Sequence, residues 1–528
     1  MPGLSKIGSL LLGALLHPNE TKALVNYAVW RDPLNRIEDN PATSGWDRDD
    51  MRKCWGFLDA TSRSFAAVIK ELDGDLSRVV ALFYLILRGL DTIEDDMSIP
   101  IDVKAPVLES FYLRLEEDGW NFTGSGPTEK DRALLVDFQV VIAEFKLLDA
   151  GYKKAISDIT KKMGEGMARY SRLYEESGGK FSVDTFASFD LYCHYVAGLV
   201  GEGLSRLFSA SGKESPELGE QLSLSNSMGL MLQKTNILRD FREDTDEGRV
   251  WWPAEIWSKY VKKPEELYAP GNEDKAMWAI SEMTVDALTH ATDALDYLTL
   301  LTNQSVFNFC AIPQVMAVAT LEKCFMNPKV MHQNVKIRKG MAVSLIMGAT
   351  NPRDVAYIFR DNVRKIHARA RANDPSFIKI AVLSGRVEQW TENRYPSYIV
   401  VGTPAPTSSA DWVEGADARI KQLGKSEDPN RDPLVIAARD ARAKAAEQAK
   451  MTGEDYKFMG FLMLGVLGIV GVMLGIGFLA LWLLVLREGA PFAETPEELD
   501  IWSKSVGMTA TSIAEAAKAT YAAVKGEL

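Results

Sequence analysis

Apolar side chains recur at every third or fourth position along most of the chain between residues 40 and 372. The clearest run contains Val79, Leu82, Phe83, Ile86, Leu87 and Leu90. On an α-helix this spacing gathers apolar side chains on one face, which can then be buried. Before residue 380 the chain shows no clear alternation of apolar and polar residues, as a strand would, and no strong hairpin signal. The pattern therefore predicts one all-α domain over residues 40–372.

Clusters of glycine and proline interrupt this helical pattern at four places. Both residue types favour turns and helix ends, so each cluster is expected to separate two helices. The breaks are predicted at residues 119–127, 177–179, 212–216 and 269–271. The domain should therefore be a bundle of long helices joined by short loops.

The pattern changes after residue 372, where prolines appear together with Ser, Thr, Asp and Gly. Residues 373–457 are predicted to be a linker with a charged helix before the next segment. Residues 458–486 contain no charged side chain. As a helix they would span about 44 Å, more than the roughly 30 Å hydrocarbon core of a bilayer. We therefore predict a C-terminal transmembrane helix, followed by a polar tail over residues 487–528.

Basic residues near the apolar segment indicate its orientation. Its N-terminal flank is richer in lysine and arginine than its C-terminal flank, which places the large N-terminal part in the cytosol. The N-terminal segment, residues 1–39, has an apolar run from Ile7 to Leu16. This run resembles a signal peptide but lacks a small-residue cleavage site. We expect a short amphipathic or buried helix there, which could associate with a membrane.

Composition narrows the function classes. Apolar residues make up 46 % of the 528 residues, enough for a large core, and the net charge of −12 argues against a nucleic-acid partner. The four cysteines have neither CxxC nor zinc-site spacing, so they are expected to be reduced and mostly buried in a cytosolic domain. With only five histidines, a histidine-based metal site is not expected.

Two acidic clusters share one template of Asp, two spacers, Glu and Asp. They are Asp91-Thr92-Ile93-Glu94-Asp95 and Asp240-Phe241-Arg242-Glu243-Asp244. On a helix, positions i, i+3 and i+4 lie on one face, so each cluster would direct three carboxylates to one point. A single cluster is as readily a solvated helix face. Two copies about 150 residues apart favour Mg²⁺, a hard cation that is bound by oxygen ligands and by substrate phosphates.

Arginines and aromatic residues extend this interpretation to a substrate class. Arg63, Arg88, Arg239 and Arg249 are expected near the acidic clusters, where guanidinium groups could bind diphosphate oxygens. An apolar, aromatic helical interior suits a long hydrocarbon chain and could stabilise a carbocation. Each arginine taken alone could equally form a surface ion pair, and each aromatic residue could be plain core. Together they predict a Mg²⁺-dependent enzyme acting on an allylic diphosphate.

Longer stretches carry a resemblance to a known family. They include residues 61–69, 83–96, 192–198, 233–240, 304–313 and 335–339, among them Tyr192-Cys193-His194-Tyr195 and Gln233-Lys234-Thr235-Asn236. The chain resembles the squalene synthases, the farnesyl-diphosphate farnesyltransferases of sterol biosynthesis within the phytoene/squalene synthase family. The resemblance implies an all-α isoprenoid-synthase domain anchored in the endoplasmic reticulum membrane. It implies coupling of two farnesyl diphosphates through presqualene diphosphate, and then reduction to squalene by NADPH.

The resemblance also implies roles for individual residues. Tyr192 would accept a proton in the first half-reaction, with released diphosphate as a competing base, and Tyr84 would contact substrate. The implied Mg²⁺ ligands, four of them also catalytic, are Asp91, Glu94, Asp95, Asp240, Glu243 and Asp244. The implied ligands of diphosphate or of NADPH phosphates are Arg63, Arg88, Asn236, Arg239, Arg249, Lys336 and Arg338. The implied lining of the hydrocarbon pocket is Phe65, Gln233 and Phe309.

Some features depart from this pattern or leave alternatives open. Arg242 places a positive charge inside the second cluster, and the tail after residue 486 is longer than the family would suggest. A phytoene- or dehydrosqualene-type synthase shares the acidic clusters without the reductive step. A non-catalytic, membrane-tethered helical scaffold is a further alternative. Other membrane enzymes of sterol synthesis are conceivable partners.

Overall fold

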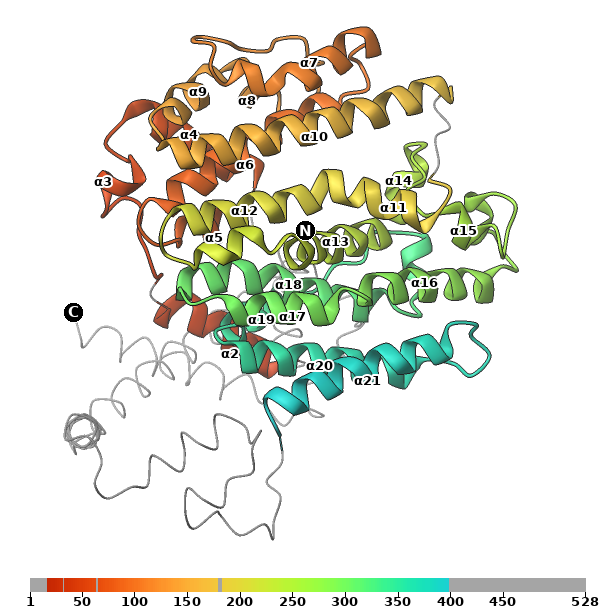
Figure 1. The fold of residues 1–528 in the computed structure, drawn as a ribbon. Coiled ribbons are helices and arrows are strands. Elements are labelled where there is room, and N and C mark those ends of the chain that lie inside the picture. The colour runs from red at the N-terminus through yellow and green to blue at the C-terminus, as the bar shows by residue number, and fades with distance from the viewer. Residues whose placement is uncertain (1–16, 32, 63–64, 179–182, 398–528) are drawn as a thin grey trace, which may run out of the picture. The chain divides into compact units, whose positions relative to one another are not determined.

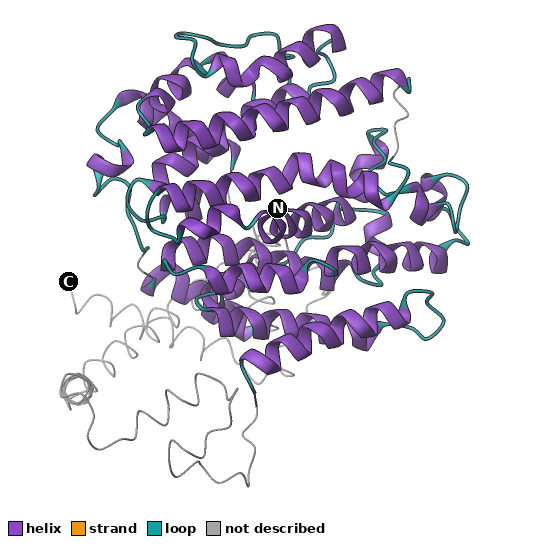
Figure 2. Cartoon of the chain, in the orientation of Figure 1, coloured by secondary structure: helices purple, strands orange, loops and turns teal. Residues whose placement is uncertain are grey.

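The computed structural model describes residues 17–31, 33–62, 65–178 and 183–397, and these residues form helices joined by loops. No strand occurs among them, which confirms the predicted all-α class (Figure 2). The expected transmembrane helix at residues 458–486, the linker from residue 398 onward and the run Ile7–Leu16 lie outside the described residues.

The helices follow one another in five groups along the chain. The first group consists of α2 (Pro18–Val25), the π-helix η1 (Asn26–Trp30), α3 (Pro41–Ser44), α4 (Asp49–Thr61), α5 (Phe65–Lys70) and α6 (Leu76–Asp95). The second consists of α7 (Ile101–Arg114), α8 (Arg132–Val136), α9 (Gln139–Lys146) and α10 (Ala150–Glu176). The third consists of α11 (Phe186–Cys193), the π-helix η2 (His194–Gly198), α12 (Leu199–Ala210) and the 3₁₀-helix η3 (Pro216–Glu220).

The last two groups complete the domain. The fourth consists of α13 (Leu222–Arg239), α14 (Phe241–Asp246), α15 (Ala254–Trp257), the 3₁₀-helix η4 (Pro264–Tyr268), α16 (Glu273–Leu288) and α17 (Ala291–Leu300). The fifth consists of α18 (Gln304–Cys324), the 3₁₀-helix η5 (Pro328–Met331), α19 (Lys339–Gly348), α20 (Pro352–Arg369) and α21 (Phe377–Arg394). All four predicted breaks fall between α-helices and are confirmed, the one at residues 212–216 ending at the first residue of η3.

The helices lie in tiers, from α7 through α10, α12 and α13 to α20 and α21 (Figure 1). Helix α13 is central, because it contacts α12, α16, α17 and α18. Close approach of α12 to α6 depends on Gly203, where a Cβ atom would come within 2.5 Å of the Phe83 ring. The acidic clusters lie at the ends of two core helices, α6 and α13.

Helix α18 is long and apolar enough to cross a membrane by length and composition, but 78 % of its apolar window is buried inside the domain. It packs against α13 and α20 and supplies Phe309 and Cys310 to the interior. Its apolar character is therefore explained by core packing, since it is surrounded by other helices.

The helical domain extends beyond residue 372, where the sequence analysis placed the start of a linker. Helix α21 packs on α20 through Ile380, Leu383 and Val387, all buried. These apolar residues repeat at three- and four-residue spacing, which is the helical pattern. The predicted boundary was wrong because the change in composition, marked by prolines from Pro396 onward, begins about twenty residues later than we placed it.

Candidate functional site

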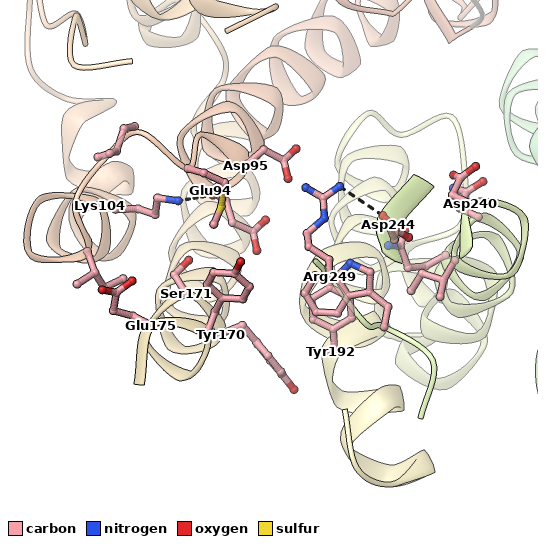
Figure 3. A pocket seen from close by; sticks show the side chains of 18 residues that line it. Glu94, Asp95, Lys104, Tyr170, Ser171, Glu175, Tyr192, Asp240, Asp244 and Arg249 are labelled. Carbon is pink, nitrogen blue, oxygen red and sulfur yellow. Dashed lines mark hydrogen bonds and ion pairs between the residues drawn. The ribbon is translucent and has the colours of Figure 1, made fainter. Parts of the chain in front are cut away.

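A cleft of about 260 Å³ lies between the two acidic clusters (Figure 3). Glu94 and Asp95 reach it from the last turn of α6, and Asp240 and Asp244 from the α13–α14 junction. Its remaining lining includes Lys104, Tyr170, Tyr192, Gln233, Asn236, Arg249 and Trp251. The structure thus brings together side chains from two distant parts of the sequence.

An apolar pocket of about 190 Å³ has a polar end formed by Arg88 and Asp91. Tyr84 and Phe83 line it from α6, and Phe65 from α5. A second apolar pocket, of about 180 Å³, shares five residues with it, namely Phe65, Val196, Val200, Leu204 and Phe309. The two volumes are therefore neighbouring parts of an apolar interior that ends at the first acidic cluster.

The first acidic cluster lies at the C-terminus of α6. A helix C-terminus carries partial negative charge, so carboxylates there are unfavourable without a cation. Burial, reinforced by Asp95 and opposed by Arg88 at 3.7 Å, raises the pKa of Asp91 to about 7. Burial and the neighbouring carboxylates likewise raise the pKa of Glu94 well above its usual value, and burial raises that of Asp95. The cluster is therefore poised to bind a positive charge.

The second cluster spans the junction of α13 and α14. Asp240 accepts hydrogen bonds from Arg239, with Nε–Oδ1 at 2.8 Å, and from the amide of Asn334. Burial raises the pKa of Asp244 to about 6, although Arg249 Nη2 lies 3.3 Å from its Oδ1. Glu243 is exposed and accepts a hydrogen bond from Asn334. All three carboxylates of this cluster therefore have an adjacent hydrogen-bond donor.

Arg242 points away from the cleft. Its Nε lies 2.8 Å from Asp246 Oδ2, and its guanidinium lies 4.4 Å from the centre of the Tyr268 ring. The extra positive charge that the sequence places inside the second cluster is therefore neutralised on the outer face of α14.

The carboxylates are a chemically suitable ligand set for Mg²⁺, because they are hard oxygen donors whose charges are only partly neutralised. Within the described ranges, however, no three side chains of the His, Cys, Asp and Glu types are close enough to form a metal cage. The expected convergence of three carboxylates within each cluster is thus not seen. Asp240 and Asp91 turn toward arginines instead, which offsets repulsion between like charges.

A pH dependence of stability follows from the raised pKa values of Asp91 and Asp244. A folded-state pKa above the usual 3.8 means that the folded protein holds protons which the unfolded chain has lost. Between about pH 4 and pH 7 these groups therefore make the metal-free protein less stable as pH rises. Since Mg²⁺ binds the ionised carboxylates, we expect it to raise the melting temperature more near pH 8 than near pH 5.

Thermal unfolding with and without Mg²⁺ at both pH values tests this expectation. In the variant Asp91→Asn the difference between the two pH values should shrink, whereas in Asp246→Asn, which alters an exposed carboxylate on α14, it should persist. An equal Mg²⁺ effect at both pH values in the unaltered protein would contradict the assignment.

Tyr192 is held by two aromatic neighbours. Its ring stacks on Trp251 at 4.1 Å with an interplanar angle of 9°, and Tyr170 meets it edge-on at 5.1 Å. Burial, with Glu94 as the main charged contributor, raises the pKa of the phenol well above its usual value. The phenol is therefore protonated at neutral pH in the metal-free protein, and its ring position is fixed.

A π-helix separates α11, which carries Tyr192, from α12. Such turns often occur at functional sites because they redirect side chains. Tyr192, just before η2, lines the polar cleft. Val196, one turn later within η2, lines both apolar pockets. The local irregularity thus connects the polar and apolar parts of the site.

Not every predicted residue reaches the cleft. Gln233, expected in the hydrocarbon pocket, lines the polar cleft beside Asn236. Lys336 is exposed, and exposed Arg338 forms an ion pair with Glu20 of α2. Arg239 points to Asp240 rather than to open space. Arg63 lies outside the residues that the structure describes.

Three residues with direct roles in the geometry were not predicted from the sequence. Lys104 is 5 % exposed and donates from Nζ to the Glu94 carbonyl oxygen at 2.6 Å, at the C-terminus of α6. Asn334 joins the segment before α19 to the second cluster. Trp251 supports the Tyr192 ring. A lysine just past the first cluster was visible in the sequence, but the contacts of Asn334 and Trp251 arise from tertiary packing.

Comparison with known proteins gives consistent matches. The family model described as squalene/phytoene synthase matches residues 58–340. A squalene synthase from Mycosarcoma maydis is 48 % identical over 94 % of this chain and 92 % of its own length. A squalene synthase from Schizosaccharomyces pombe is 52 % identical over 71 % of this chain and 81 % of its own length. The solved complex of TcSQS with the ligand BPH1237 has a TM-score of 0.62 and 39 % identity, covering 66 % of this chain and 99 % of that one.

Proposed function

The chain belongs to the squalene/phytoene synthase family, and we propose that it couples two farnesyl diphosphates head to head and reduces the product to squalene. The observation that carries this function is the match to squalene synthases across most of the chain, together with a two-cluster cleft beside an apolar interior. This arrangement suits a substrate with a diphosphate at one end and a hydrocarbon chain at the other.

In the first half-reaction, bound Mg²⁺ would supply positive charge to stabilise the diphosphate that leaves an allylic carbon. We assign its ligands to Asp91, Glu94 and Asp95 on one side of the cleft and to Asp240, Glu243 and Asp244 on the other. Arg249 lines the cleft and Arg88 lies at the polar end of the apolar pocket, so we assign both to diphosphate oxygens, which would replace part of their pairing with Asp244 and Asp91.

The remaining site residues would handle the cation and its proton. The allylic cation would lie against the aromatic lining, where desolvated rings contribute about 0.5 to 2 kcal/mol each. Phe65, Tyr84 and Phe309 occupy that lining. Tyr192, which lines the polar cleft, is assigned to receive the proton lost as the cyclopropane of presqualene diphosphate closes, while its own hydroxyl proton passes to the released diphosphate.

When bound, NADPH would supply the hydride for the second half-reaction. The phosphates of NADPH need cationic partners. Lys336 and Arg338 are exposed cations that follow closely after Asn334 in the sequence, and Asn334 donates a hydrogen bond to Asp240 of the second cluster. Asn236 and Arg239, from the last turns of α13, and Arg63 complete the proposed set. Arg338 forms an ion pair with Glu20 in this structure, so a phosphate of NADPH would compete with Glu20 for the Arg338 guanidinium.

The function is tested by supplying farnesyl diphosphate and Mg²⁺ with and without NADPH and identifying the products by mass spectrometry. We expect presqualene diphosphate to accumulate without NADPH and to be converted to squalene when NADPH is added. Products that do not depend on NADPH would favour a phytoene- or dehydrosqualene-type synthase and would overturn the reductive step.

We further propose that residues 40–397 form the catalytic domain, facing the cytosol at the endoplasmic reticulum, with residues 458–486 as its membrane anchor. Absence of charge over those residues supports the anchor. A protein lacking residues 458–528 should remain active and move from the membrane fraction to the soluble fraction. A truncated protein that folds but has no activity, or that stays in the membrane fraction, would contradict this assignment.

A further inference from the structure

Lys234 is a buried lysine that the reaction does not use directly. Its side chain, on α13, is 1 % exposed, and it does not line the cleft. Its Nζ lies 2.6 Å from Asp190 Oδ1 on α11 and 2.9 Å from Asp286 Oδ2 on α16. The ammonium also lies 5.6 Å from the centre of the Phe189 ring on α11. One charge therefore joins three helices.

Two of these helices contribute residues to the lining of the cleft. Tyr192 follows Asp190 by two residues on α11, and Asn236 and Asp240 follow Lys234 on α13 and at its C-terminus. The third helix, α16, contributes no residue to the cleft lining. The ion pair between Lys234 and Asp190 thus directly connects the helix of the tyrosine to the helix of the second acidic cluster.

Stability alone does not account well for this arrangement. A buried ion pair recovers little more than the cost of desolvating its charges, and well-packed apolar residues often stabilise a core equally well. Burial lowers the pKa of Lys234, but the two carboxylates more than compensate, so it is charged. What the charges add is a defined distance, because the ammonium holds a carboxylate of α11 and a carboxylate of α16 within 2.9 Å of one point on α13.

We propose that Lys234 is a positioning residue, which holds α11 against α13 so that the Tyr192 hydroxyl keeps a fixed place relative to Asn236 and Asp240. The expected effect on the reaction rate rests on the proposed function. A displacement of about 1 Å in a reacting group can cost about 10²-fold in rate. Lys234→Met should therefore lower kcat for presqualene diphosphate formation about ten- to a hundredfold, with little change in KM.

A matched control separates positioning from stability. Arg48 and Glu144 form another ion pair, with Nη2–Oε2 at 2.6 Å, in which Glu144 is buried and Arg48 is partly exposed; it joins the start of α4 to α9 and does not line the cleft. Arg48→Met and Lys234→Met should both lower the melting temperature, since each leaves a buried charge unpaired. Only Lys234→Met should lower kcat at a temperature where both variants are folded, and Lys234→Arg should restore part of it.

A second measurement does not depend on activity. Amide hydrogen exchange of α11 should accelerate in Lys234→Met and not in Arg48→Met. If Lys234→Met fails to fold, Asp190→Asn replaces it, because Asp190 is 48 % exposed and its loss leaves Lys234 paired with Asp286. Unchanged exchange in α11, or equal kcat in the two methionine variants, would overturn the proposal. If the proposed function is wrong, the unaltered protein will make no presqualene diphosphate. The hydrogen-exchange result would still decide whether Lys234 positions α11.

Discussion

Asp240→Asn should reduce turnover of farnesyl diphosphate by about 10² to 10³-fold, equivalent to about 2.7 to 4 kcal/mol of transition-state stabilisation. The substitution keeps the shape of the side chain and removes its charge, which is the property that Mg²⁺ needs. Asp240 accepts hydrogen bonds from Arg239 and Asn334 at Oδ1, and an asparagine oxygen can still accept there, although the Arg239 bond to Oδ2 is lost. Asp91→Asn at the opposite cluster should have a similar effect. Initial rates at saturating substrate, measured across a range of Mg²⁺ concentrations, give the result.

The control for this prediction is Asp246, the last residue of α14. Asp246→Asn also removes one carboxylate from α14, but Asp246 is exposed and pairs with Arg242 on the outer face. Its turnover should be close to that of the unaltered protein. Full activity of Asp240→Asn and Asp91→Asn in cells would support the alternative of a non-catalytic scaffold, and it would contradict the metal assignment.

The sequence predicted the parts of the site that depend on one helix. The i, i+3 and i+4 spacing correctly placed Asp91, Glu94 and Asp95 on one helix, α6, although their carboxylates do not converge on one point as expected. Helix ends were also predictable, since glycine and proline have strong local preferences. The resemblance to squalene synthases, carried by longer stretches of sequence, is confirmed by the family match.

The parts that depend on packing between helices could not be predicted in the same way. Gln233 and Lys234 are neighbours in one motif, yet Gln233 lines the cleft and Lys234 is buried on another side of α13. Which side faces which neighbour is decided by α11, α16 and α18 together, and spacing along α13 does not contain that information. Asn334 reaches Asp240 from a loop about ninety residues away, for the same reason.

The raised pKa values connect the fold to the chemistry. Core helices α6 and α13 both end at the cleft, so their C-terminal partial charges add to the charges of the carboxylates. Such an arrangement destabilises the metal-free protein and favours any cation that binds there. The apolar pocket, whose polar end is Asp91, would then hold the hydrocarbon chain with its reacting carbon near the metal.

A last prediction concerns the proton acceptor of the first half-reaction. Tyr192 is protonated in this structure, because burial and Glu94 raise the pKa of its phenol. A phenol can still accept the departing proton if it passes its own proton to another base at the same moment, and the diphosphate is such a base. If the hydroxyl is required, Tyr192→Phe should slow formation of presqualene diphosphate by about 10² to 10⁴-fold. The ring stacking on Trp251 at 4.1 Å should survive, because the substitution removes only the oxygen.

The two half-reactions distinguish this role from a general loss of structure. Supplied with presqualene diphosphate and NADPH, Tyr192→Phe should still form squalene at a rate close to that of the unaltered protein, since the tyrosine is assigned only to the first step. Tyr170→Phe is the matched control, because it removes a hydroxyl from the ring that packs edge-on against Tyr192 in the same cleft. It should leave both half-reactions nearly unchanged. A loss of less than about tenfold in the first half-reaction of Tyr192→Phe would be too small for general base catalysis, and it would assign the proton to the released diphosphate alone.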